Sequence, residues 1–117
     1  MQAQRQGLAR LDAHMLLLHS LGRSQHDRAW LLAHDDDALP ADTLVHYQAL
    51  CQQRAAGVPL AYLTGHKQFY GLELAVDARV LDPRPDTETL VDWALELLAP
   101  CAAPRIADLG TGSGAIA

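Results

Sequence analysis

The chain has 117 residues, the usual length of one domain and short for an enzyme that holds both a cofactor and a substrate. Its formal net charge of −5 at pH 7 argues against direct binding to nucleic acid. Its two cysteines lack metal-ligand or disulfide spacing, and no apolar run approaches the ~20 residues of a membrane span. We therefore expect a cytoplasmic protein without a membrane partner.

The first half of the chain is rich in Leu and Ala and predicts helices. Residues 10–22 are apolar almost all around a helix, so this helix must be covered on several sides. Gly22 is expected to end it, and Ser24 is expected to cap a second helix that ends near His34.

A third helix is predicted at residues 41–56, before Gly57 and Pro59. Its expected apolar stripe consists of Leu44, Tyr47, Cys51 and Ala55. With a short helical piece that Gly65 stops, these segments predict a helical bundle over residues 1–66.

The pattern then changes to a period of two. Leu72, Leu74 and Val76 alternate with other residues as in a half-buried strand, and a turn at 69–71 predicts a β-hairpin. Residues 67–85 are therefore expected to form a hairpin and a proline-rich linker. Asp86 is expected to cap a helix that ends at Pro100.

The sequence RIADLGTGSGAIA at residues 105–117 predicts a strand over 105–109, a glycine loop and the start of a helix. Such a loop lets the backbone approach a ligand closely. Asp108 at the strand end suits a cationic ligand such as S-adenosylmethionine, and a pyrophosphate would gain nothing from it. A methyl donor is favoured, and a nicotinamide or flavin enzyme stays open. The six histidines lack the i, i+4 spacing of a helical zinc site, so no metal is expected.

Three stretches together resemble the release-factor glutamine methyltransferases of the HemK/PrmC family: AYLTGHKQFYGLELAVD at 61–77, RVLDPRPDTETLVDWALELL at 79–98, and residues 105–117. RLDAHMLLLHSLG and QRAAGVPLAYLTG also resemble the helical N-terminal domain of this family. One departure is Asp82, which stands where an apolar residue is expected, so the hairpin packing should differ there.

The resemblance implies methyl transfer from S-adenosyl-L-methionine to the glutamine side-chain nitrogen in the Gly-Gly-Gln motif of peptide chain release factors. It implies a helical domain that helps to hold the release factor, a joining hairpin and a Rossmann-like methyltransferase domain that begins at residues 86–117. The implied cofactor-binding residues are Asp108, Gly110, Thr111, Gly112 and Gly114. The implied residues of the substrate cleft are Arg84, Pro85, Thr87 and Glu88.

The catalytic Asn-Pro-Pro-Tyr motif of this family does not occur in the 117 residues, so we expect the chain by itself to be inactive. Two alternatives remain. One is a methyltransferase of the same fold that acts on an amide or amine of another protein or of a nucleic acid. The other is a stand-alone helical module that binds release factors.

Overall fold

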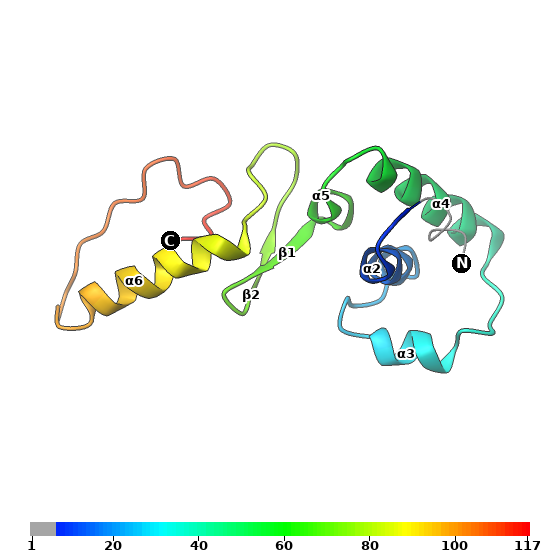
Figure 1. Cartoon of the computed structure of the whole chain (residues 1–117), viewed down its shortest axis with the longest axis horizontal. Coiled ribbons are helices and arrows are strands. Elements are labelled where there is room, and N and C mark those ends of the chain that lie inside the picture. The colour runs from blue at the N-terminus through cyan, green and yellow to red at the C-terminus, as the bar shows by residue number, and fades with distance from the viewer. Residues whose placement is uncertain (1–6) are drawn as a thin grey trace. The chain divides into compact units, whose positions relative to one another are not determined.

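A computed structural model describes residues 7–117, and the chain divides after Thr64 into two units (Figure 1). The first unit is helical, whereas the second holds a two-stranded hairpin, one longer helix and an irregular tail. The chain is thus a mainly helical N-terminal domain followed by a hairpin and a C-terminal helix. Residues 1–6 of the expected helical domain lie outside the described residues.

The helices of the first unit lie where the hydrophobic pattern predicts them. They are α2 (Arg10–Ser20), α3 (Arg28–Ala33), α4 (Ala41–Ala55) and α5 (Leu60–Thr64). The chain after α2 turns through Gly22, whose φ of +69° is a conformation that favours glycine.

α2 is the central helix of this unit, because α3, α4 and α5 all contact it. Leu16 and Leu18 are 0 % exposed, which confirms that this helix is covered on several sides. The core consists of Ala13, Leu16, Leu50 and Cys51, with Leu8, Tyr47, Leu60 and Leu63 packed against it. The helical unit therefore has a hydrophobic core of its own.

A partly buried ion pair also joins α2 to α4. Arg54 Nε donates a hydrogen bond to Asp12 Oδ2 at 3.0 Å, and Arg54 Nη1 donates to the carbonyl of Val58 at 3.3 Å. One guanidinium thus connects the last turn of α4 to the first turn of α2 and to the chain that leads into α5.

Two local predictions for this unit are wrong. Ser24 does not cap α3; its Oγ accepts the N–H of His26 at 3.2 Å in a local turn, and the helix begins only at Arg28. The predicted stripe of α4 is correct for the buried Cys51 and for Tyr47, which packs against the core, but wrong for Ala55, which is exposed. Leu50 is buried beside Cys51.

The predicted hairpin is confirmed. Strands β1 (His66–Phe69) and β2 (Leu72–Ala75) pair antiparallel, with Phe69 opposite Leu72. The two-residue loop has positive φ at both positions, +51° at Tyr70 and +74° at Gly71, as a type I′ turn requires. Phe69 and Val76 are buried, and the N–H of Val76 donates to the carbonyl of Gly65 at 3.0 Å.

The linker after the hairpin leads into a short 3₁₀ turn, η1 (Pro85–Thr87), and then into α6 (Glu88–Leu98). The prediction that Asp86 caps this helix is wrong, because Asp86 lies inside η1. Pro85 begins η1 instead, since its fixed φ suits the first position of a helical turn.

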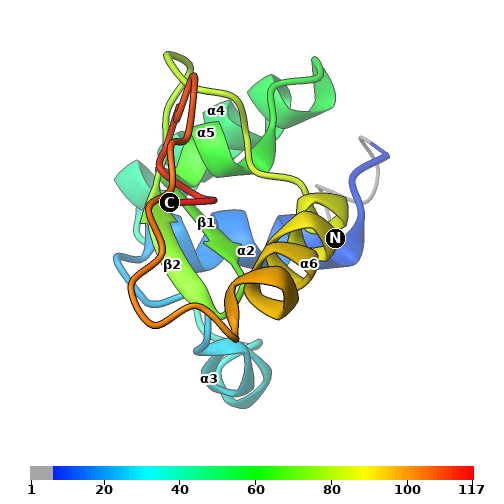
Figure 2. The ribbon, with the colours of Figure 1, turned by 90° about the vertical axis from the view of Figure 1, so that its left-hand side faces the viewer.

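The strand predicted at 105–109 and the helix start after it are absent from the structure, so the beginning of a Rossmann-like sheet is not seen. The chain after α6 runs back toward the hairpin without regular structure (Figures 1 and 2). Ile106 is 71 % and Leu109 is 92 % exposed. A strand needs a hydrogen-bonding neighbour, and in the described residues β1 and β2 pair only with each other.

Candidate functional site

The glycine loop has the backbone that a ligand-facing turn needs. Gly110, Gly112 and Gly114 have φ of +68°, +57° and +80°, values that L side chains rarely adopt. The N–H of Gly114 donates to the carbonyl of Thr111 at 2.9 Å and closes the turn. Residues 111–114 therefore form one tight turn, although no strand or helix lies directly beside it.

Asp108 lies just before this loop and fits a cationic ligand group. Its Oδ2 atom is buried and accepts no hydrogen bond from the residues that the structure describes. A buried carboxylate oxygen without a donor is costly unless a positive group or donor reaches it. The chemistry of Asp108 and of the glycine backbone is thus compatible with the amino or sulfonium group of S-adenosylmethionine.

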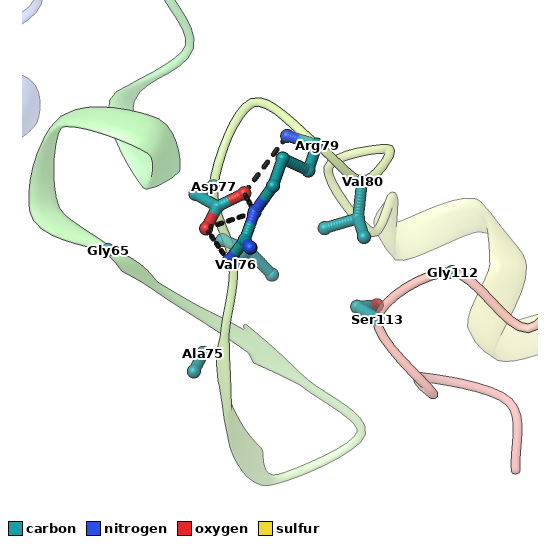
Figure 3. A pocket seen from close by; sticks show the side chains of 8 residues that line it. All are labelled: Gly65, Ala75, Val76, Asp77, Arg79, Val80, Gly112 and Ser113. Atoms are coloured by element: carbon teal, nitrogen blue, oxygen red, sulfur yellow. Dashed lines mark hydrogen bonds and ion pairs between the residues drawn. The ribbon is translucent and has the colours of Figure 1, made fainter.

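A pocket of about 680 Å³ lies in the second unit, between the chain that leaves β2 and the glycine loop (Figure 3). It is lined by Gly65, Ala75, Val76, Asp77, Arg79, Val80, Gly112 and Ser113. Of the predicted cofactor-binding residues only Gly112 lines this pocket. This pocket therefore includes one of the five predicted cofactor-binding residues.

The wall of this pocket carries a closed charge pair. Arg79 donates from Nε to Asp77 Oδ1 at 2.9 Å and from Nη2 to Asp77 Oδ2 at 2.6 Å (Figure 3). These bonds lower the pKa of Asp77 to about 2. Sequence reasoning missed this pair, although an acid two residues before an arginine at the end of a strand could have suggested it.

The predicted cleft residues lie along one short segment. Arg84 and Pro85 are exposed, and the carbonyl of Arg84 accepts the N–H of Thr87 at 3.1 Å. Pro83, before them, is buried. A buried and an exposed proline therefore flank an exposed arginine, which limits the conformations of the backbone that carries its charge.

Glu88, the fourth predicted cleft residue, contacts the hairpin. Its Oε1 accepts the backbone N–H of Tyr70 at 2.8 Å, and the hydroxyl of Tyr70 donates to Asp92 Oδ1 at 2.5 Å. The hydrogen bond to Asp92 raises the pKa of Tyr70. Both contacts join residues 18 and 22 positions apart, so no local sequence pattern predicts them.

Asp82, the departure from the family pattern, is buried, and its Oδ1 lies 3.8 Å from Lys67 Nζ on β1. The acid at this position thus adds an ion pair to the hairpin where an apolar side chain was expected.

Other titratable side chains give no sign of a reactive centre. Burial raises the pKa of both Tyr47 and Cys51 in the helical core, so both stay neutral near pH 7. Within residues 7–117, no group of three or more His, Cys, Asp or Glu side chains could hold a metal ion. No helix among the described residues is long and apolar enough to cross a membrane.

These features define a class of protein in which a small helical domain is joined by a β-hairpin to a helix and a glycine-rich loop. Residues 1–65 match the family model described as the PrmC N-terminal domain, and the chain belongs to this family.

Three curated relatives carry the name release factor glutamine methyltransferase. A release factor glutamine methyltransferase of Bordetella pertussis is 54% identical over 111 residues, which are 95% of this chain and 40% of that protein. Proteins of the same name from Xylella fastidiosa and Burkholderia pseudomallei are each 50% identical, over 94% and 92% of the chain. The chain is thus related to release factor glutamine methyltransferases, and it spans about two fifths of the length of these relatives.

Proposed function

We propose that this chain is the front portion of a release factor glutamine methyltransferase. The enzyme would transfer a methyl group from S-adenosylmethionine to the glutamine side-chain nitrogen in the Gly-Gly-Gln motif of peptide chain release factors, in the cytoplasm. The observation that carries the proposal is the 54% identity to the Bordetella pertussis protein over 95% of the chain. Because the catalytic Asn-Pro-Pro-Tyr motif is not among these residues, the 117-residue chain alone should not catalyse the transfer.

We assign three parts to this function. Residues 1–66 would help to bind the release factor, residues 67–85 would form the joining hairpin and linker, and residues 86–117 would open the methyltransferase domain. The core of the helical unit supports the first assignment, because a domain with its own core can present a binding surface without the rest.

Exposed apolar side chains support the third assignment. On α6 they are Leu90, Trp93, Leu95 and Leu97, and in the tail they are Ile106 and Leu109. A soluble domain rarely leaves so many large apolar side chains exposed together, whereas residues that open a larger domain would be covered by it.

The cofactor would be held by Asp108, Gly110, Thr111, Gly112 and Gly114. The donor-free carboxylate oxygen of Asp108 and the positive φ of the three glycines support this assignment. S-adenosylmethionine, when bound, supplies an electrophilic methyl group on a positively charged sulfur. The role of these residues is to bind and orient it.

Arg84, Pro85, Thr87 and Glu88, the predicted residues of the substrate cleft, would form one wall of that cleft, which we call the substrate wall. An amide nitrogen is a poor nucleophile because its lone pair is delocalised, so its orientation toward the methyl group matters greatly. The restricted backbone around Arg84 supports a role in such positioning.

The test is methyl transfer by the protein expressed from its complete reading frame. Purified release factor and labelled S-adenosylmethionine are mixed with it, and the modified peptide is read by mass spectrometry. We expect one methyl group on the glutamine of the Gly-Gly-Gln motif, and none when this glutamine is replaced by glutamate. Methylation of another protein or of nucleic acid, with the release factor unmodified, would overturn the proposal in favour of a same-fold methyltransferase.

A second candidate is a stand-alone module that binds release factors. The match of the family model to residues 1–65, together with the separate helical core, favours this candidate over other non-enzymatic functions. Binding of release factor without any transfer of methyl, and with no effect of S-adenosylmethionine on the affinity, would select it.

A further inference from the structure

One residue of the hairpin turn makes two hydrogen bonds to α6. The backbone N–H of Tyr70 donates to Glu88 Oε1 at 2.8 Å, and its hydroxyl donates to Asp92 Oδ1 at 2.5 Å. Glu88 and Asp92 are four residues apart, so they lie one above the other on the same face of the helix. Both acceptors are carboxylates, which form stronger hydrogen bonds than neutral groups do.

The residue that makes these contacts has an unfavourable backbone conformation. Tyr70 is the only non-glycine residue with positive φ among residues 7–117, at +51°. Type I′ turns favour Asn, Asp or Gly at this position, because a larger side chain is strained there. Such strain persists where surrounding contacts compensate for it, and it is often found at functional sites.

The two acceptors, Glu88 and Asp92, lie in the first two turns of α6, next to the other residues of the substrate wall. Glu88 is the first residue of α6, directly after η1 with Pro85 and Thr87. A helix N-terminus also favours nearby carboxylates. The turn therefore holds the helix at the end from which the wall extends.

We infer that Tyr70 is a positioning residue, which with Glu88 and Asp92 fixes the substrate wall against the hairpin turn. The inference rests on the proposed function, which assigns the wall to this segment. It also changes the role of Glu88, whose carboxylate supports the wall through Tyr70 and does not contact the substrate.

The two hydrogen bonds from Tyr70 to Glu88 and Asp92, which we call the clasp, can be tested on the 117-residue chain independently of activity. In the Asp92→Asn variant we expect the pKa of the Tyr70 phenol to fall, as measured by NMR titration of the tyrosine ring. In the Glu88→Gln variant we expect faster hydrogen exchange of the Tyr70 amide. Glu96→Gln is the matched control, since it removes an exposed carboxylate that lies one turn of α6 beyond Asp92. Unchanged Tyr70 signals in both test variants would show that the clasp does not exist.

The positioning role is tested by methyl-transfer kinetics of the protein from its complete reading frame. We expect Tyr70→Phe and Asp92→Asn each to lower kcat by roughly tenfold or more with KM for S-adenosylmethionine nearly unchanged, because only the orientation of the wall is disturbed. The double variant should be no slower than Tyr70→Phe alone, since Tyr70→Phe removes the hydrogen bond that Asp92→Asn weakens.

The outcomes separate this inference from the proposed function. Wild-type kcat in both single variants, or additive losses in the double variant, would overturn the positioning role while leaving the proposed function intact. An unmodified release factor with the wild-type enzyme would overturn the proposed function, and the wall assignment with it. Proper folding of each variant is checked by the wild-type pattern of amide signals outside residues 66–92.

Discussion

At the scale of single residues, the pair of Asp77 and Arg79 shows how a charged side chain near a candidate site can already be engaged. Arg79 makes four hydrogen bonds to the Asp77 carboxylate, one of them from its backbone N–H and three from its guanidinium group. The Nε and Nη2 groups of the guanidinium are therefore directed at Asp77 (Figure 3).

We predict that Arg79→Gln raises the pKa of Asp77 from about 2 toward the ordinary value of 3.8. Because the folded-state pKa lies below the unfolded value, the pair stabilises the fold fully above pH 3.8 and loses its effect as the pH falls through about 2. NMR titration of the Asp77 carboxyl carbon measures the shift, with Arg105→Gln as the control. A wild-type Asp77 that titrates at its ordinary value would contradict this prediction.

At the scale of elements, the contact between α2 and α4 combines an apolar core with one ion pair. We predict that Arg54→Met destabilises the helical unit by about 1–2 kcal/mol, because it leaves the partly buried Asp12 without its donor. Urea unfolding followed by circular dichroism gives the free energy. The exposed Arg28→Met on α3 should change it by less than about 0.5 kcal/mol. Equal effects of the two variants would show that the Asp12–Arg54 pair does not stabilise the contact.

The apolar part of this contact is tested by two leucines on the same helix. Leu16 is 0 % exposed, whereas Leu11 is 47 % exposed. We predict that Leu16→Ala lowers the free energy of unfolding by about 2–5 kcal/mol and that Leu11→Ala lowers it by less than about 1 kcal/mol. Thermal and urea unfolding of both variants measure these losses. A larger loss for Leu11→Ala than for Leu16→Ala would show that α2 buries its other face.

The elements that the sequence predicted well are those with a strong local signal. The all-round apolar pattern of α2 and the turn at 69–71 needed no information from distant residues. The predicted caps Ser24 and Asp86 were wrong, because either residue can also lie in a turn beside the helix, and the sequence does not show which conformation wins. The strand at 105–109 was wrong because strand formation depends on a neighbouring strand, which no local pattern contains.

The candidate site was less predictable than the fold for the same reason. The family resemblance identified the segment with Arg84, and the glycine loop was evident from its composition. The contacts of Tyr70 with Glu88 and Asp92 could not be predicted from the sequence, because they depend on how the hairpin packs against α6.

At the scale of the whole molecule, the chain consists of two units, and each has its own set of contacts. The core residues of the helical unit all lie before Thr64. We therefore predict that a chain cut after Thr64 loses only the helical circular dichroism signal of α6 and keeps its urea midpoint. Loss of cooperative unfolding in the shortened chain would show that the hairpin unit is needed for this core.

Binding of the release factor by the helical unit can be measured directly. A calorimetric titration of the 117-residue chain with a purified peptide chain release factor, with and without S-adenosylmethionine, makes this measurement. We expect saturable binding that the helical unit provides and that the cut after Thr64 preserves. A chain that shows the wild-type helical signal yet releases or absorbs no heat on mixing with the release factor would contradict it.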